Sequence, residues 1–293
     1  MKNSANAPPS QTNSCGALTT PIVLLTATLP DRAELLRRAL ESVLKQSVLP
    51  DHAVLVSDAA RATDVAPLTF AHPAVGLHCL VNQSAPGAAN TWNVGIRYVA
   101  RHWPDCYIAM LDDDDEWDSD HLATCSMQAH RASWPDAVIS GLRMVQNGVE
   151  HYRPPVHRVT EKEFLVGNPG WQGSNTFIRC STVVSAGAFT PGLQSCNDRD
   201  LAIRVLALPG VRIAFTCRHT ATWHLDNSRI SLSAKNNPRK LDGLAFFYIL
   251  HEHRMTADIK SLFFERAETV FGWRKEDITV RAKEHRDAAV CTP

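Results

Sequence analysis

Apolar runs of strand length alternate with segments of helical period over the first part of the chain. Residues 21–28, PIVLLTAT, form a compact apolar run, which predicts a buried parallel strand. Pro30 ends this run, and the leucines that follow recur at helical spacing, so a helix is expected to begin at Asp31. Asp31 and Glu34 have the spacing of a capping box, which would fix the first turn of that helix.

The same alternation continues to residue 111 and changes after residue 135. It predicts strands at 53–58, 75–81 and 107–111, with a helix at 87–102 before the last of them. In the second part Asn147-Gly148 is a type I′ hairpin signal. The predicted strands of this part are 137–140, 142–146, 149–153, 175–179, 211–215 and 221–224. The predicted helices are 198–208, 241–251, 257–271 and 275–288.

These elements predict the fold class. Strands that alternate with helices are typical of α/β domains, in which a mostly parallel, twisted sheet carries helices on both faces. A C-terminal helical segment follows at 233–293. In open α/β sheets, ligands bind outside the carboxyl ends of the strands. Polar residues at those ends are therefore the candidates for a functional site.

Composition limits the class of protein further. A chain of 293 residues can bury one large core or two modest ones. Its 30 basic and 30 acidic residues balance, so no global field directs it to nucleic acid or to a membrane. Residues 1–20 are polar and are expected to be a disordered tail, not a signal peptide. No apolar run approaches the roughly 18 residues that span a bilayer. The eight scattered cysteines include no CxxC pair, which predicts reduced thiols in a cytoplasmic protein.

Five consecutive acids, Asp112 to Glu116, follow the predicted strand at 107–111. Neighbouring like charges repel by about 1 kcal/mol per close pair in water, so such a run either points into solvent on a turn or surrounds a cation. Carboxylates without sulfur or imidazole in the cluster suit a hard ion, Mg²⁺ or Mn²⁺, that is shared with substrate phosphates. Both interpretations stay open at this point. An EF-hand is disfavoured because Trp117 stands where that loop needs Gly.

Several motifs occur in the order and spacing of a known family. They are Thr26-Ala27-Thr28 with Arg32, then Asp58, the segment from Gly87 to Ile96 that contains Asn93, Leu111 to Asp115, Asn197 to Leu201 with Arg204, and His224 followed by residues 227–231. With these motifs, the chain from about Pro21 to Ser233 resembles the family 2 glycosyltransferases of the GT-A fold. The resemblance implies a GT-A domain at 21–232, with a nucleotide-sugar half at 21–118 and an acceptor half at 119–232.

The resemblance also implies which residues bind the donor and the metal. The donor-binding residues would be Thr26, Ala27, Thr28, Arg32, Asp58, Asn93, Asp112 and Asp113. Within Asp112-x-Asp114, Asp114 would bind Mn²⁺ or Mg²⁺, and His224 would add a contact to the metal or a phosphate. From the sequence pattern alone, His224 would be interpreted as an ordinary core or surface histidine. His219 is the fallback candidate for the ligand.

On the acceptor side, Asp198 matches the family's catalytic base. A hydroxyl is a poor nucleophile until a base takes its proton in the transition state. Asp200 is the second choice, and a helix-terminal acid without chemistry is the alternative reading of Asp198. Asn197 stands where the family usually has Glu. Trp171 and Gln172 are expected to line the acceptor side, with a core tryptophan as the alternative.

Together these roles imply an activity. The resemblance implies metal-dependent, inverting transfer of a sugar from a nucleotide-diphosphate sugar, with UDP as the expected nucleotide, to a hydroxyl acceptor. The acceptor stays open among saccharides, lipid-linked glycans, peptide side chains and modified nucleobases. A nucleotidyltransferase is the first alternative, although the stretch after the first strand lacks the glycine-rich phosphate loop it would need. A sugar- or metal-binding module without catalysis is the second, and the presence of both Asp114 and Asp198 argues against it.

The C-terminal helices carry apolar residues that need a partner surface. These residues are Leu244, Phe246, Phe247, Leu250, Phe263, Phe264 and Phe271. The helices are expected to pack over the acceptor side of the sheet, or to form a homodimer interface. His251-Glu252-His253 suggests a metal site at first sight. Adjacent positions on a helix diverge, however, so these side chains are expected to be solvated.

Overall fold

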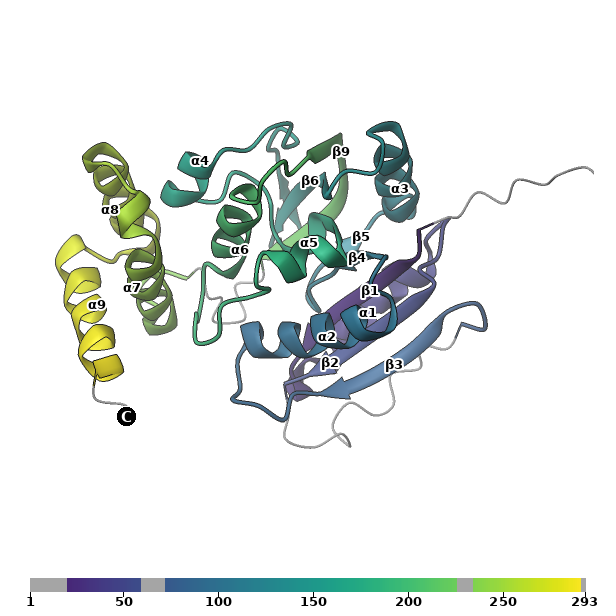
Figure 1. The fold of residues 1–293 in the computed structure, drawn as a ribbon, viewed down its shortest axis with the longest axis horizontal. Helices are drawn as coiled ribbons and strands as arrows, with labels where there is room; N and C mark the ends of the chain where they lie inside the picture. Colours follow the sequence, from purple (N-terminus) through teal and green to yellow (C-terminus); the bar gives the residue numbers. More distant parts are fainter. Residues whose placement is uncertain (1–19, 59–71, 226–233, 291–293) are drawn as a thin grey trace, which may run out of the picture.

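The computed structural model describes residues 20–58, 72–225 and 234–290 (Figure 1). The strands are β1 Ile22–Thr28, β2 His52–Ser57, β3 Gly76–Val81, β4 Tyr107–Met110, β5 Glu116–Trp117, β6 Ala137–Gln146, β7 Val149–His151, β8 Thr176–Arg179 and β9 Ile213–Leu225. The helices are α1 Ala33–Leu44, α2 Ala88–His102, α3 His121–Arg131, α4 Glu161–Val166, α5 Cys180–Ser185, α6 Asn197–Leu206, α7 Pro238–His251, α8 Ala257–Phe271 and α9 Lys275–Val290. Within these ranges the predicted α/β class is confirmed.

The strands form one sheet in the order β3-β2-β1-β4-β8-β6-β9-β5, with β7 paired to β6. The strands β3, β2, β1 and β4 run parallel, whereas β8 is antiparallel to both of its neighbours. The strand β9 returns parallel to β6. Because β1, β2 and β4 are parallel, their carboxyl ends meet at one edge of the sheet. Thr28, Asp58 and the acidic run all lie at or just after these ends.

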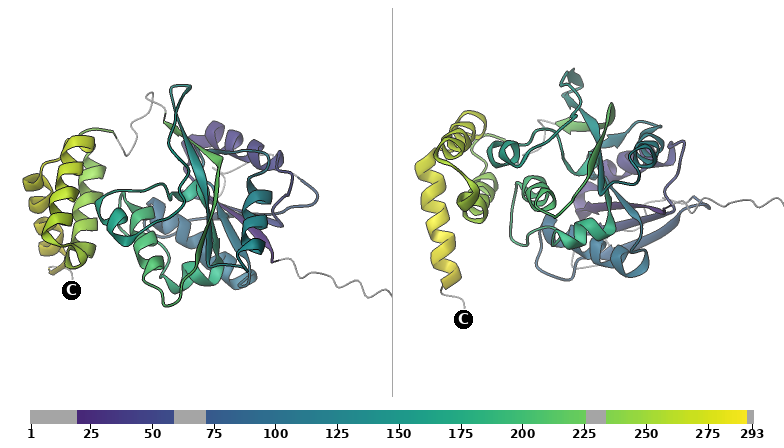
Figure 2. Two further views of the ribbon diagram at one scale, coloured as in Figure 1. Left: turned by 90° about the horizontal axis from the view of Figure 1, so that it is seen from above. Right: turned by 45° about the horizontal axis from the view of Figure 1, so that its top comes forward.

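Helices cover both faces of the sheet, as predicted. On one face the apolar side of α1, with Leu36, Leu40 and Val43, packs with α3. On the other face α2 and α5 pack against the sheet, and the same apolar cluster continues without interruption into α6, α7 and α8. Figures 1 and 2 show α7, α8 and α9 stacked at one end of the molecule, beyond α4 and α6.

The apolar residues of the C-terminal helices find their partner surface within the chain. Leu244, Phe247 and Phe263 are almost completely buried, in the cluster that also contains the apolar side chains of α6. The close approach is possible because α7 carries Gly243, whose Cα faces Ser195; an added Cβ would lie 2.7 Å from the Ser195 backbone nitrogen. The C-terminal helices are therefore continuous with the core of the acceptor half. Within the described residues, none of the helices is both long and apolar enough to cross a membrane.

The start of α1 differs from the prediction. A 3₁₀ turn at Pro30–Arg32 precedes the helix, which begins at Ala33, and no side chain caps it. Glu34 instead accepts a hydrogen bond from Arg37, one turn further along. The capping-box prediction at Asp31 was therefore wrong, because the proline turn displaces the helix start by two residues.

The predicted turn at Asn147-Gly148 is confirmed. The hairpin between β6 and β7 turns at Asn147-Gly148, with φ of 50° and 78°, as a type I′ turn requires. Two pairs of predicted strands are instead single long strands, β6 and β9, which are irregular around Gly141. The helices α3, α4 and α5 were not predicted.

Candidate active site

The acidic run lies directly after β4 and is only partly exposed. The backbone of Leu111 still bonds to Leu25 of β1, with an N–O distance of 3.1 Å, and the chain then turns so that Asp115 N donates to Asp112 O. Asp113 and Asp115 are 2% and 1% exposed. A solvated acidic turn would expose its carboxylates to water. The burial of two of them excludes that interpretation.

Two residues after β1 hold Asp113 in place. Arg32 donates to Asp113 Oδ1 at 2.6 Å and also pairs with Asp114. Thr28 donates to Asp113 Oδ2 at 2.7 Å. Burial raises the pKa of Asp113 to about 6, and the Arg32 charge and the Thr28 hydrogen bond oppose that rise. Thr28 and Arg32, both predicted to bind donor, thus lie at the acidic run, and in this structure they bind its carboxylates.

Ser174 joins Asp112 and Asp115. Its hydroxyl donates to Asp115 Oδ2 at 2.5 Å and lies 3.2 Å from Asp112 Oδ2. Gly173 brings the backbone close to the Asp112 carboxylate, since an added Cβ would lie 2.8 Å from Oδ2. The pKa of Asp112 is raised well above its usual range, first by burial and then by the charges of Asp115 and Asp198. Asp112 and Asp198 therefore lie close enough for their charges to interact.

Asp198 stands in the first turn of α6, after a backbone turn at Cys196 with φ of 68°. Burial raises the pKa of Asp198 to about 6, and the positive charge of Lys240 acts against that rise. Lys240 comes from α7 and is itself buried, with Nζ 3.7 Å from Cys196 Sγ. Beside it, the buried amide oxygen of Asn197 has no hydrogen-bond donor among the described residues. The C-terminal helices were expected to pack over the acceptor side, but no single residue of α7 was predicted to reach this loop.

Asp200 is fully engaged in structural contacts. Its carboxylate accepts from Thr190 at 2.7 Å, from Arg204 at 2.6 Å and from His251 Nε2 at 2.9 Å. Burial opposes its ionisation, but the hydrogen bonds from His251 and Arg204 prevail and lower its pKa to about 2. This bonding disfavours Asp200 as a base. The expectation that His251 is solvated was wrong, because that side chain is buried against α6.

Two of the predicted donor-binding residues, Asn93 and Thr26, are buried, whereas two others are partly exposed. The side-chain amide of Asn93 makes two hydrogen bonds with the backbone of Phe189. Asn93 Nδ2 donates to Phe189 O at 2.8 Å, and Asn93 Oδ1 accepts from Phe189 N at 2.9 Å. Thr26 is completely buried within β1. Asp58 accepts from Gly87 N and Asn82 Nδ2, both at 2.8 Å, and so fixes the start of α2. The burial of Asn93 and Thr26 argues against direct contact with a donor, whereas Asp58 and Ala27 lie at the carboxyl ends of β2 and β1 and are partly exposed.

His224 lies beside the acidic run, as predicted. Its backbone nitrogen donates to Asp115 Oδ1 at 3.1 Å, and its Nε2 lies 2.6 Å from Glu116 Oε2. Burial and the charge of Arg38 lower the pKa of His224, against the opposing effect of Glu116. The fallback His219 instead contacts the carbonyl of Arg153 at 2.7 Å. Residues 227–231 of the late loop lie outside the described residues.

Trp171 takes the role of a core residue, which was the alternative to acceptor binding. Its indole is 3% exposed, packs edge-on against Phe164, and donates from Nε1 to Thr176 Oγ1 at 2.8 Å. Gln172 is partly exposed next to Gly173, and so remains at the rim of the site.

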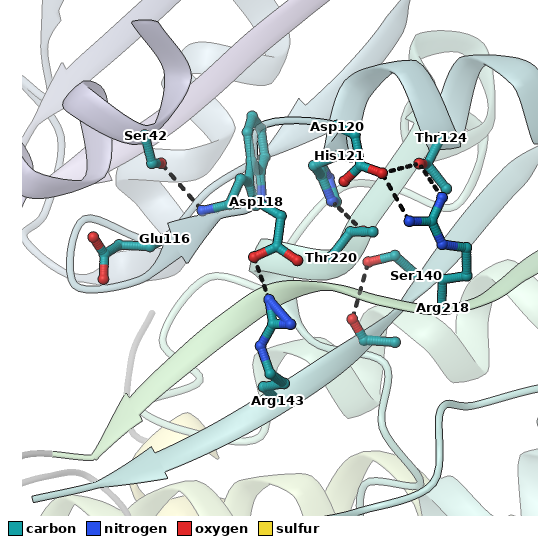
Figure 3. A network of polar contacts seen from close by, with 12 residues as sticks. Ser42, Glu116, Asp118, Asp120, His121, Thr124, Ser140, Arg143, Arg218 and Thr220 are labelled. Atoms are coloured by element: carbon teal, nitrogen blue, oxygen red, sulfur yellow. Dashed lines mark hydrogen bonds and ion pairs between the residues drawn. The ribbon is translucent and has the colours of Figure 1, made fainter. Parts of the chain in front are cut away.

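A polar network fixes the segment that follows the acids (Figure 3). Trp117 N donates to Ser42 of α1, and its indole Nε1 donates to Ser174 O at 2.6 Å. Arg143 of β6 pairs with Asp118, and Thr220 of β9 contacts His121 at 2.8 Å. These bonds join α1, β5, β6, α3 and β9 behind the acidic run. Its carboxylates are thus held by rigid neighbours.

The carboxylate oxygens of the run are of the kind that bind a hard divalent cation. Arg32 pairs with Asp113 and Asp114, and Arg38 pairs with Glu116. Burial and then the charges of neighbouring carboxylates raise the pKa of both Asp112 and Asp115. In residues 20–58, 72–225 and 234–290, no three His, Cys, Asp or Glu side chains are placed to hold a metal by themselves. Mg²⁺ commonly takes one or two carboxylates and completes its shell with phosphate oxygens and water. A cation at this run would therefore need further ligands, such as substrate phosphate oxygens and water.

Comparison with known proteins gives a family and a fold. Residues 30–185, more than half of the chain, match the family described as Glycosyl transferase family 2. No curated protein matches the sequence. Among solved structures, S. aureus TarS 1–349 in complex with UDP-GlcNAc has a TM-score of 0.64 and 14% identity, over 91% of this chain and 78% of that one.

Two further structures of the same TarS segment are similar to this chain. Its complex with UDP has a TM-score of 0.60 and 13% identity, over 85% of this chain and 72% of that one. The segment described without a ligand has a TM-score of 0.58 and 12% identity, over 92% of both chains. At such low identities the likeness concerns the fold, which is of the GT-A type.

Proposed function

The chain belongs to glycosyl transferase family 2, and on that basis we propose that it transfers a sugar from a UDP-linked donor to a hydroxyl acceptor, with a divalent metal and with inversion. The nucleotide is proposed from two of the similar structures, which are complexes of TarS with UDP and UDP-GlcNAc. The donor would lie at the carboxyl ends of β1, β2 and β4, where open α/β sheets bind their ligands.

One observation carries the proposal. The charge of Asp198 raises the pKa of Asp112, although strands β5 to β8 lie between the two acids along the chain. An acid at the end of β4 and an acid in the first turn of α6 thus lie within range of each other's charge. Displacement at a sugar carbon needs a group at each end, one for the leaving diphosphate and one for the incoming hydroxyl. The pair Asp112 and Asp198 supports that arrangement.

On the donor side, Asp114 and His224 would hold Mn²⁺ or Mg²⁺, with Asp112 beside them. When bound, such an ion supplies charge that stabilises the leaving diphosphate. Asp113 would keep Arg32 at the rim of the donor site through their 2.6 Å ion pair. Ser174 and Gly173 would fix the Asp112 carboxylate against the strand end.

On the acceptor side, Asp198 would accept the proton of the attacking hydroxyl. The new bond forms between the acceptor oxygen and the anomeric carbon, while the bond from that carbon to the diphosphate oxygen breaks and its electron pair leaves with the diphosphate. Attack from the face opposite the leaving group inverts the anomeric centre. The unpaired amide oxygen of Asn197 would accept a further hydrogen bond from the acceptor, and Gln172 would border it.

The experiment is a donor screen. UDP, GDP and dTDP sugars are incubated with the protein and Mn²⁺, and release of the nucleoside diphosphate is measured with and without EDTA. Release from UDP sugars that EDTA abolishes is the expected result. Release that EDTA leaves unchanged would overturn metal dependence, and pyrophosphate release from a nucleoside triphosphate and a sugar phosphate would indicate a nucleotidyltransferase.

A further inference from the structure

An open groove of about 570 Å³ lies between β3 and α2, at the outer edge of the sheet. The strand and the turn after it contribute Cys79, Leu80, Val81 and Gln83, and the helix contributes Val94, Arg97, Tyr98 and Arg101. Figure 1 shows β3 on the side of the molecule away from α8 and α9. None of the residues that line the groove belongs to the candidate active site.

The strand β3 has a free edge along this groove. In the part of the chain that the structure describes, it pairs only with β2. Asn82 N donates to Ser57 O at 2.8 Å and the register with β2 is uninterrupted, so the even-numbered positions of β3 bond into the sheet. Because backbone groups alternate in direction along a strand, the N–H and C=O groups of Cys79 and Val81 point away from β2. Such an edge is a template for a further strand.

Two arginines of α2 give the groove a positive charge. Arg97 and Arg101 are four residues apart, so they lie on the same face of the helix, and both are exposed. The described residues that line the groove include no aspartate and no glutamate. Neither guanidinium has a hydrogen-bond or ion-pair partner among the described residues. The two positive charges are therefore available to a partner.

The free edge and the arginines have matching periods. Tyr98 OH lies 3.0 Å from His78 Nδ1, so the even-numbered side chains of β3 face α2. A strand added beside β3 would turn every second side chain to that same face. Two residues of such a strand advance about 6.7 Å, and four residues of a helix advance about 6 Å. Side chains two residues apart on the added strand therefore match the spacing of Arg97 and Arg101.

We propose that this groove binds an acidic, extended segment of a partner protein as an additional strand beside β3. Backbone hydrogen bonds to Cys79 and Val81 would hold the segment, and two carboxylates two residues apart would pair with Arg97 and Arg101. A second copy of this chain is a poorer occupant, because pairing two β3 edges would bring arginines of like charge together. The proposal uses neither the donor nor the acids, so it is independent of the proposed sugar transfer.

The charge of the groove is tested with a labelled, capped peptide of alternating threonine and glutamate. Fluorescence anisotropy at low salt measures its binding to the full-length protein, and added salt should weaken that binding. Arg97→Gln and Arg101→Gln are each expected to weaken binding severalfold, and the double variant at least tenfold. Arg131→Gln, an exposed arginine on α3 outside the groove, removes the same charge and should leave binding unchanged.

Strand pairing is tested separately from charge. The same peptide with methylated backbone nitrogens keeps its carboxylates but loses its backbone donors, and it should bind at least tenfold more weakly. Cys79→Pro removes an outward N–H without breaking a bond to β2, so it should weaken binding of the unmodified peptide. Cys79→Ala keeps that N–H and should bind as wild type does. The melting temperature shows whether Cys79→Pro is folded; if it is not, the methylated peptide decides.

Several results would overturn the docking site. These are absence of peptide binding by the wild-type protein, equal loss in Arg131→Gln, and equal binding of a peptide of alternating threonine and lysine. Equal binding of the methylated peptide would exclude the added strand. Self-association of the wild-type protein that Cys79→Pro abolishes would assign the edge to a second copy instead. The donor screen separates the two proposals: cleavage without peptide binding removes only the docking site, and peptide binding without cleavage removes only sugar transfer.

Discussion

His251 Nε2 lies 2.9 Å from Asp200 Oδ1, and both side chains are almost completely buried. The first belongs to α7 and the second to α6, two residues after Asp198. The C-terminal helices are thereby joined to the helix that carries the proposed base, at the same place where Lys240 reaches Cys196. The position of Asp198 depends on these contacts.

Asp200 should make the protein sensitive to acid. Its pKa of about 2 lies below the ordinary 3.8, so its ionised form stabilises the fold above pH 4, and that stabilisation, about 2 kcal/mol, is lost as the pH falls towards 2. Urea unfolding at pH 7 and pH 3 is the measurement. Asp200→Asn is expected to lower stability at pH 7 and to differ less from wild type at pH 3. Asp105→Asn, an exposed acid, should show neither effect; a pH-independent deficit in Asp200→Asn would contradict the prediction.

Asp198→Asn should separate chemistry from folding. The amide keeps the shape but cannot take a proton, so transfer at saturating donor is expected to fall by roughly 10²–10⁴. Binding of UDP with Mn²⁺ should barely change, because the residue faces the acceptor. Melting temperature and turnover are measured on the same sample. Turnover close to wild type would exclude Asp198 as the base.

The pH profile of transfer should report the same carboxylate. Only the ionised form of Asp198 can accept a proton, so activity is expected to rise with pH through about 6. Because the Lys240 charge lowers the pKa of Asp198, Lys240→Met should move the rise to higher pH. Lys283→Met, an exposed lysine on α9, is the matched control. A profile that stays in place in Lys240→Met would show that this lysine does not set the ionisation of the base.

Asp114→Ala should abolish the metal dependence of UDP binding and leave the fold intact. Asp114 is the more exposed partner of Arg32, with a side-chain exposure of 36%, so its loss removes a ligand oxygen without emptying the core. Calorimetry of UDP with and without Mn²⁺ is the assay, and Asp105→Ala is the control. If Mn²⁺ still strengthens UDP binding in Asp114→Ala, the metal is held elsewhere.

Removal of the chain from residue 234 onward should leave an aggregating protein. The truncation exposes the side of α6 that Leu244 and Phe247 cover, and it removes the partner of Asp200. Light scattering on the full-length and truncated proteins distinguishes the outcomes. If the full-length protein is a dimer and the truncated protein is a soluble monomer, the result would instead support a homodimer interface formed by the C-terminal helices.

The sequence was sufficient where short-range chemistry decides the structure. The turn at Asn147-Gly148 needs residues that tolerate positive φ, and the pattern contains them side by side. The position of the acids at the end of β4 followed from an apolar run that stops at Leu111. The capping-box signal was present at Asp31, but Pro30 starts a turn there that the spacing alone does not reveal.

The sequence was insufficient where the partner lies far along the chain. Asn93 bonds to Phe189, 96 residues away, and His251 bonds to Asp200, 51 residues away. Neither spacing carries a periodic signal, so Asn93 was assigned to the donor and His251 to solvent. Lys240 escaped notice for the same reason, because one lysine in a helix has no pattern until its neighbours are known.

The contact at Gly243 limits how this enzyme can be recombined with others. A chimera that grafts foreign C-terminal helices onto residues 20–225 would need a residue without a side chain opposite Ser195, since a Cβ there meets the backbone itself. It would also need a histidine for Asp200 and a lysine beside Cys196. Exchange at the apparent boundary near residue 233 would therefore fail, whereas a crossover before Thr190 would carry both sides of the contact together.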